Sequence, residues 1–184
     1  MSKKALIFLA NGSEETEAIT VVDLLRRANI TVKIAGDNEL VTCSRGVKII
    51  PDILIEQVDI LDEYDVVILP GGNSGVSHLS KNIYVQKILK HYSQNKVLIA
   101  AICAAPSILI ENKIINETTI FTGFPTLKDD FPNFNYIDEA VVYDIKKKIL
   151  TSQALGTSIP FALSIIELII DKTTSDKIKK EIVF

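Results

Sequence analysis

Short apolar runs alternate with segments of helical period along most of this chain. Five runs rich in Val, Ile and Leu are bounded by turn residues and predict strands at residues 5–10, 31–35, 65–69, 97–102 and 118–121. Because these runs are almost continuously apolar, we expect all five to be central, buried strands. With helices between them, the pattern predicts an α/β sandwich, in which a mostly parallel sheet carries helices on both faces.

The first helix is expected at residues 14–28. Ser13 precedes it as an N-cap, and Glu14 and Glu15 fall in its first turn, where carboxylates suit the helix dipole and are commonly solvated. The start of this helix is therefore well marked in the sequence.

Several further segments have simple patterns. Alternating runs at 39–51 and 135–152 predict antiparallel additions at the sheet edge, with a hairpin tip at 146–148. Residues 159–170 predict a buried helix, and residues 175–184 a short docked one. Without repeats or a long linker, we expect residues 1–184 to form one domain.

Composition and charge narrow the classes of partner. The chain has 184 residues, of which 47% are hydrophobic, and a formal charge of −3 with no basic stripe, so no nucleic-acid partner is expected. Its apolar runs are too short for a membrane span or a secretory leader, and we expect a cytoplasmic protein. The two cysteines, Cys43 and Cys103, form no zinc or CxxC pattern.

Cys103 is the strongest candidate for chemistry. It directly follows the strand at 97–102 and precedes small residues and Pro106, which suits the first turn of a helix. This order is typical of a nucleophile elbow, which exposes a side chain above the sheet. We expect the helix start to lower the pKa of the thiol and favour the thiolate. Alone, Cys103 would more often be a packed, inert thiol.

Glu17 favours a reactive Cys103 over an inert one, because it shares an apolar helical stripe with Val21, Leu24 and Ala28. A carboxyl on such a stripe points toward the sheet, where burial would raise its pKa and let the acid donate a hydrogen bond to the Cys103 thiolate. We expect the two to form a coupled acid and nucleophile.

Backbone donors complete the predicted site. Gly71 and Gly72 follow the strand at 65–69, and Gly72 N–H with Ala104 N–H would hold an oxyanion. A simple tight turn is the alternative. His78 follows a loop and His91 ends a polar helix, so both are expected at the surface, and position 104 is alanine, so an amidase or peptidase is disfavoured.

Four segments together make a recognisable set: KALI (4–7), GSEETE (12–17), LPGGN (69–73) and AAICAAP (100–106). The chain resembles the ThiJ/PfpI superfamily, and within it the branch that holds the parkinsonism-associated protein deglycase and bacterial YajL. The resemblance implies a flavodoxin-like three-layer sandwich and a homodimer. It also implies no cofactor, an oxidisable Cys103, a protonated Glu17 and a role in oxidative stress.

The resemblance extends to further residues. Arg27 and Arg45 match arginines that bind anions near the pocket in the branch, Asn73 belongs to its LPGGN loop, and Cys43 matches a secondary cysteine near the dimer contact. Two departures stand out: Phe124 occupies a position where the branch often has histidine, and residues 154–157 read ALGT instead of GPGT.

Three hypotheses about function follow. The first is a glyoxalase or deglycase in which Cys103, assisted by Glu17, attacks a small carbonyl compound or a glycated adduct. The second is a redox sensor or redox-regulated chaperone in which Cys103 is oxidised to sulfinic acid. An amidase or peptidase is the third. Some relatives also carry names that refer to thiazole monophosphate biosynthesis.

Overall fold

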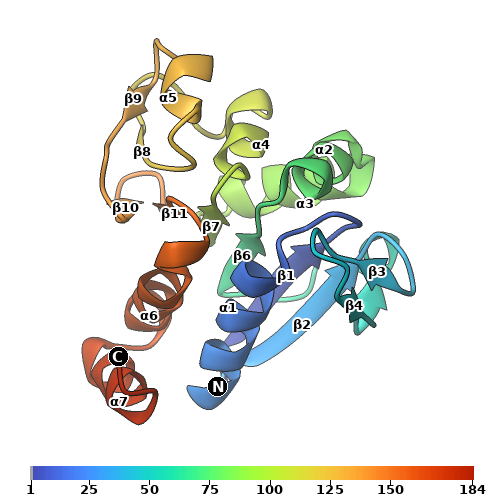
Figure 1. Cartoon of the computed structure of the whole chain (residues 1–184), viewed down its shortest axis with the longest axis vertical. Helices are drawn as coiled ribbons and strands as arrows, with labels where there is room; N and C mark the ends of the chain where they lie inside the picture. Colours follow the sequence, from blue (N-terminus) through green and yellow to red (C-terminus); the bar gives the residue numbers. More distant parts are fainter. Residues whose placement is uncertain (1) are drawn as a thin grey trace.

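A seven-stranded sheet organises the computed structural model, which describes residues 2–184 (Figure 1). The strand order is β10-β11-β7-β6-β1-β2-β5, and every pair except β10–β11 is parallel. The strands are β1 (Lys4–Leu9), β2 (Thr31–Gly36), β5 (Ile53–Leu54), β6 (Val66–Leu69), β7 (Leu98–Ile102), β10 (Val141–Asp144) and β11 (Ile149–Ser152).

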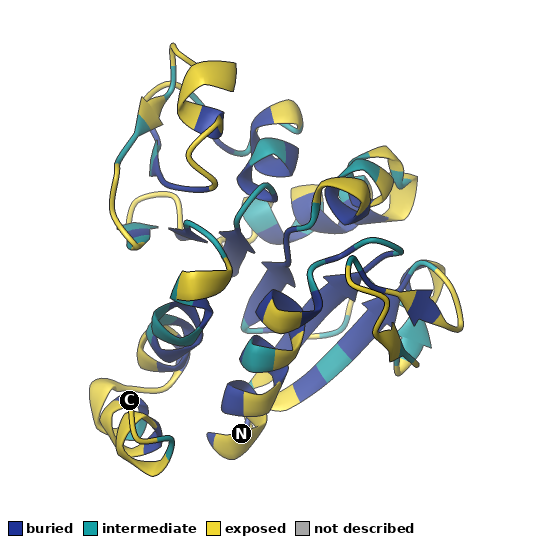
Figure 2. Ribbon diagram, viewed as in Figure 1, coloured by how far each residue is buried: buried dark blue, intermediate teal, exposed yellow. Residues whose placement is uncertain are grey.

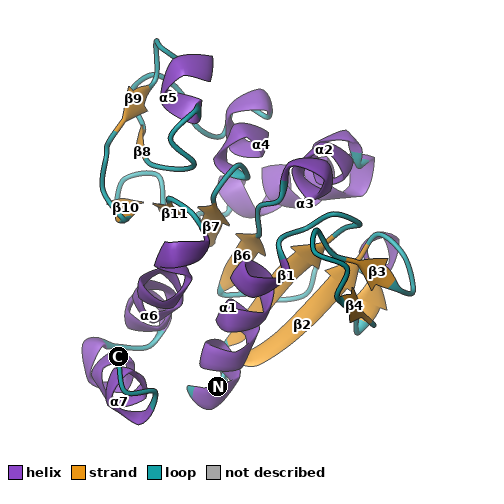
Figure 3. Ribbon diagram, in the orientation of Figure 1, coloured by secondary structure: helices purple, strands orange, loops and turns teal. Residues whose placement is uncertain are grey.

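Helices cover both faces of this sheet (Figure 3). One face carries α1 (Glu15–Arg27), α6 (Ser158–Ile169) and α7 (Lys172–Glu181), and the other carries α2 (Asn73–Lys81), α3 (Ile83–Gln94) and α4 (Pro106–Glu111). Successive side chains of β1 alternate between two cores, with Ile7 in the first and Leu6 and Phe8 in the second. Because β6 and β7 are buried at every position and β1 at every position after Lys4 (Figure 2), these strands are almost continuously apolar, as the sequence predicted.

The predicted fold class is confirmed, and four of the five predicted strands occur within one residue of their expected ends. The 159–170 and 175–184 helices correspond to α6 and α7. The predicted edge addition at 135–152 is also present: β10 and β11 pair antiparallel, with residues 146–148 in the turn between them.

The prediction that the fifth strand lies in the central sheet was wrong. Residues 118–121 were expected to form a central strand, but only β8 (Ile120–Phe121) is extended, and it pairs with β9 (Asn135–Tyr136) in a separate two-stranded sheet. The position beside β7 belongs to β11 instead. Phe121 is fully buried all the same, which explains its apolar character.

The hairpin at 39–51 is present but also forms its own sheet. Its strands β3 (Val41–Thr42) and β4 (Lys48–Ile49) pair antiparallel and do not join the edge of the main sheet. The hairpin is anchored to the loop after β1 instead, since Gly12 N–H donates to Thr42 O at 2.9 Å and Ser44 N–H to Ser13 O at 2.8 Å. Three short helices complete the fold: η1 (Ile55–Gln57), α5 (Leu127–Asp130) and η2 (Leu155–Thr157).

The start of α1 also differs from the expectation. The N-cap is Glu14, whose carboxylate accepts from Thr16 N–H at 3.3 Å. Ser13 is instead fully buried and accepts from Ala10 N–H, so its hydroxyl closes the turn after β1. Serine is the better N-cap by type, but the tight turn after β1 takes up its hydroxyl, so the cap falls to Glu14.

The topology brings three loops together. β1 lies between β2 and β6, so the chain direction across the sheet reverses beside it, and ligands of open α/β sheets bind at the carboxyl ends of strands at such a point. Gly71 and Cys103 lie in the loops after β6 and β7, and Glu17 lies in the first turn of α1, directly after the loop that follows β1. None of the helices within residues 2–184 is both long and apolar enough to cross a bilayer.

Candidate active site

Cys103 lies on a strained turn that the main chain holds on both sides. Its φ is +64°, in the left-handed region, where a non-glycine residue costs on the order of 1 kcal/mol or more. Its N–H donates to Ser152 O at 3.0 Å, and its carbonyl accepts from Phe124 N–H at 2.7 Å. The turn leaves the side chain half-buried at the edge of a cavity. This is the geometry of a nucleophile elbow.

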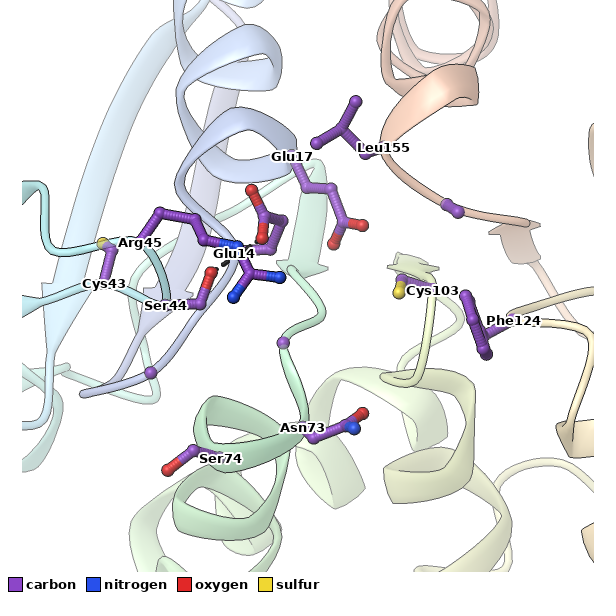
Figure 4. Close-up of a pocket in the computed structure, with 13 residues that line it drawn as sticks. Glu14, Glu17, Cys43, Ser44, Arg45, Asn73, Ser74, Cys103, Phe124 and Leu155 are labelled. Carbon is purple, nitrogen blue, oxygen red and sulfur yellow. Dashed lines mark hydrogen bonds between the residues drawn. The ribbon is translucent and has the colours of Figure 1, made fainter.

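Glu17 reaches over this turn from α1, and its carboxyl points toward Cys103 in Figure 4. The residue is 1% exposed, its Oε2 accepts from Gly71 N–H at 2.8 Å, and its carboxyl lies close enough to the Cys103 thiol for each group to affect the pKa of the other. Burial raises the pKa of Glu17 to about 7 from 4.5, although the N–H of Gly71 and the Cys103 thiol oppose the rise. The direction agrees with the sequence argument from its apolar stripe.

The expectation of a lowered thiol pKa was wrong. Burial, then the charge of an ionised Glu17 and its contact with the thiol, raise the pKa of Cys103 to about 12, while Ala104 and Gly72 N–H groups lower it. The short helix that follows does not outweigh the loss of water. Because the glutamate's contribution depends on its charge, the thiolate is compatible with a protonated Glu17 and not with an ionised one. At neutral pH the Cys103 thiol therefore carries its proton, and Glu17 is the member of the pair that gains or loses one.

The N–H groups of Gly71 and Gly72, the two glycines after β6, face different partners. Gly71 N–H is taken up by Glu17, whereas Gly72 N–H, together with Ala104 N–H, faces the Cys103 sulfur. Gly72 has φ +87°, and a side chain there would strike Gly12 O. Only glycine fits this position, which lets the loops after β1 and β6 touch.

A cavity of about 560 Å³ opens in front of the sulfur. Its walls differ in chemistry, with polar and charged groups toward the β3–β4 hairpin and α2, and apolar groups toward the loops before α5 and α6 (Figure 4). The lining residues are Gly12, Glu14, Glu17, Cys43, Ser44, Arg45, Gly72, Asn73, Ser74, Cys103, Phe124, Ala154 and Leu155.

The two arginines have different positions. Arg45 lines the cavity and, within residues 2–184, makes no ion pair within 4.0 Å. Arg27 lies outside the cavity at the far end of α1, where its Nε pairs with Asp23 at 2.7 Å. A single chain thus brings Arg45 but not Arg27 to the predicted site.

Cys43 lines the same cavity but is 4% exposed. Burial, then the charges of Glu15 and Glu14, raise the pKa of its thiol to about 11. These surroundings hold Cys43 in the protonated form, so it is poorly suited to act as a nucleophile.

Sequence reasoning missed the role of the acidic first turn of α1. Glu15 was expected at the surface but is 7% exposed, because Ser44 hydroxyl donates to it at 2.9 Å and Arg45 N–H at 2.9 Å. Burial raises its pKa, but hydrogen bonds outweigh this and the pKa lies below its ordinary value. Glu14 accepts from the same hydroxyl at 2.7 Å. No local pattern signals these contacts, which join segments thirty residues apart.

Groups for other chemistries are lacking near the sulfur. In the part of the chain that the structure describes, neither His78 nor His91 lines the cavity. Residues 2–184 likewise contain no cluster of three or more His, Cys, Asp or Glu side chains that could hold a metal ion. The described residues thus bring a cysteine thiol, a buried carboxyl and two backbone N–H groups to one end of the cavity.

Fold and site thus define a flavodoxin-like α/β protein with an elbow cysteine. Comparison with known proteins assigns the family: residues 3–168 match the model of the DJ-1/PfpI family, and the chain belongs to it.

Individual relatives agree with this assignment. Protein dj-1beta of Drosophila melanogaster is 39% identical over 98% of this chain and 96% of its own, and its crystal structure superposes with a TM-score of 0.93 over 100% and 98% of the two chains. The glutathione-independent glyoxalase DJR-1.2 of Caenorhabditis elegans is 36% identical over 90% and 88%. A structure described as oxidised Toxoplasma gondii DJ-1 has a TM-score of 0.94 at 32% identity, over 100% and 99%.

The raised pKa of Glu17 predicts a pH-dependent stability. The folded protein favours the protonated acid, so this contribution is fully present below pH 4.5 and is lost as pH rises through about 7. From pH 5 to pH 8 the free energy of unfolding of wild type should fall by about 2 to 3 kcal/mol relative to Glu17→Gln. Urea unfolding at both pH values measures this, and parallel pH profiles would contradict the assignment.

Proposed function

We propose that this chain is an enzyme of the cofactor-independent glyoxalase or deglycase type, acting on small dicarbonyls or their adducts. The observation that carries the proposal is the coupled pair of Cys103 and Glu17, which line the same cavity and in which the acid has a pKa of about 7. A proton carrier is most effective when its pKa lies near the working pH. The name of the worm relative, a glutathione-independent glyoxalase, supports the same activity.

The first step is addition. The Cys103 sulfur forms a bond to the aldehyde carbon, the carbonyl π bond breaks, and the thiol proton passes through Glu17 to the oxygen, which gives a hemithioacetal. Gly72 and Ala104 N–H groups, which face the sulfur, are placed to stabilise the negative oxygen while it forms.

The second step moves a proton within the substrate. Glu17 as carboxylate removes the proton from the former aldehyde carbon, and the resulting enediol is reprotonated at the neighbouring carbon. The first carbon is thereby oxidised to a thioester and the second reduced to an alcohol, so no external oxidant is needed. Water then cleaves the thioester, which releases a 2-hydroxy acid and restores the thiol.

Incubation with methylglyoxal in the absence of glutathione tests the proposal. We expect stoichiometric conversion to lactate, measured by NMR, and in D2O the product should carry deuterium at carbon 2 if the enediol exchanges with solvent. The control is protein alkylated with iodoacetamide. Lactate formation no faster than this control would contradict the proposal.

A redox sensor is the second candidate, since the half-buried sulfur faces two N–H donors and an acid that would hold a sulfinate. The oxidised Toxoplasma relative favours it. Mild peroxide should then add two oxygens to Cys103 and none to buried Cys43, as measured by peptide mass. Negligible turnover together with this selectivity would favour sensing, and resistance of Cys103 to oxidation would exclude it.

We also propose that the protein forms a homodimer and works in the cytoplasm. Exposed apolar side chains support the dimer, among them Ile19 on α1 and Val47 and Ile50 at the β3–β4 hairpin, which are 41%, 49% and 78% exposed. Light scattering after gel filtration should give twice the mass of one chain.

A further inference from the structure

The cavity has an apolar side that proton transfer at Cys103 does not use. Phe124, Ala154 and Leu155 form this apolar wall, and Phe124 and Leu155 are 43% and 49% exposed. Figure 4 shows Phe124 beside Cys103, on the side away from Arg45. Leu155 lies nearer Glu17 in the same view, so one exposed apolar side chain flanks each member of the pair.

Backbone contacts hold Phe124 near Cys103 and Leu155 near Glu17. Phe124 N–H donates to the carbonyl of Cys103 at 2.7 Å, and the backbone of Leu155 lies near enough to the carboxyl of Glu17 to lower its pKa slightly. The turn that carries Leu155 is closed by Thr157 N–H donating to Ala154 O at 2.8 Å. Because these contacts involve backbone atoms, substitution of the side chains leaves the positions of the apolar wall and of the reacting pair in place.

The polar side of the cavity lies opposite the apolar wall and could bind the oxygen atoms of a ligand. Arg45 and Asn73 line it, and Arg45 has no carboxylate partner within residues 2–184. A ligand that matches the whole cavity therefore has an oxygen-bearing end and an apolar end, with an electrophilic carbon between them at Cys103. The methyl group of methylglyoxal is too small to cover both Phe124 and Leu155.

We propose that the preferred substrate is an α-oxo aldehyde whose ketone carbon carries an aryl or branched alkyl group. This inference rests on the proposed function. The aldehyde carbon bonds to Cys103, the apolar group lies on Phe124 and Leu155, and the oxygens face Arg45 and the backbone donors. The reaction balances as described above and gives the aryl or alkyl 2-hydroxy acid.

Two assays test the inference. The first compares kcat/KM for phenylglyoxal and methylglyoxal. The second compares alkylation of Cys103 by phenacyl bromide and by bromoacetone, which carry the same aryl and methyl ketones but need no turnover. Each alkylation rate is divided by the rate for glutathione, which removes the intrinsic reactivity of the reagent.

We expect the aryl compound to be favoured by about tenfold or more in both assays, a typical size for added apolar contact in a pocket. Phe124→His and Leu155→Ala should each reduce that ratio several-fold, mainly through KM. Phe184→Ala and Leu40→Ala remove exposed apolar side chains (55% and 47% exposed) outside the cavity and serve as matched controls.

The outcomes separate the two proposals. An aryl preference in alkylation that Phe124→His abolishes, with neither dicarbonyl consumed, would uphold the apolar wall and overturn the glyoxalase proposal. Turnover of methylglyoxal with no aryl preference, or a preference that Phe124→His leaves unchanged, would overturn the inference alone. A preference that the two control variants reduce equally would also overturn it.

Discussion

Cys103→Ala is expected to lower kcat/KM for methylglyoxal by on the order of 10³-fold, because the hemithioacetal cannot form without the sulfur. The variant should fold normally. Alanine meets the same strain at φ +64°, and the hydrogen bonds that hold the turn involve only backbone atoms. Lactate production and thermal unfolding, measured on the same preparation, check both parts.

Cys43→Ala is the matched control, since it removes the other thiol of the cavity. Burial and two carboxylates keep that thiol protonated, so we expect a loss below about tenfold. If Cys103→Ala kept more than about a tenth of wild-type activity, the reaction would need a different nucleophile. An equal loss in both variants would point to a general effect of altered packing.

The central sheet could be predicted from the sequence because its strands are buried on both faces. β6 and β7 are continuous apolar runs, β1 is apolar after Lys4, and β2 is interrupted only at Thr31 and Lys33, so local pattern alone locates these strands. β8 failed for the opposite reason. Its apolar residues are equally buried, but the position beside β7 is decided by pairing with β11, thirty residues later in the chain.

The site residues, like the strands, could be predicted where the local sequence pattern is unusual and not where distant segments decide their surroundings. Glu17 and Cys103 could be paired from the sequence because each is locally anomalous: one is a carboxyl on an apolar stripe, the other a cysteine at a strand end. The burial of Glu15 depends on a hairpin that packs from a distance, and no local pattern records it. The direction of the thiol pKa was missed because desolvation by the complete fold exceeds the effect of a six-residue helix.

The backbone at Gly71 approaches Cys103 and Glu17 so closely that a methyl group added at this position would collide with both. A Cβ added at Gly71 would lie 2.5 Å from Cys103 Cβ and 2.6 Å from Glu17 Oε2, so both members of the pair would have to move. A displacement of about 1 Å at a reacting centre typically costs about 100-fold in rate, and overpacking costs about 1 to 3 kcal/mol of stability. We expect Gly71→Ala to show both losses.

Gly156→Ala separates this effect from the general consequences of replacing glycine. Gly156 lies in η2, near the same cavity, and an added Cβ there would meet no atom within 4 Å. The kcat/KM and the unfolding midpoint of the Gly156→Ala variant should stay close to those of wild type. A Gly71→Ala protein with full activity would mean that Cys103 and Glu17 tolerate separation, and proton transfer between them would then not be the basis of catalysis. Loss of activity with unchanged stability would instead locate the whole effect in the alignment of the pair.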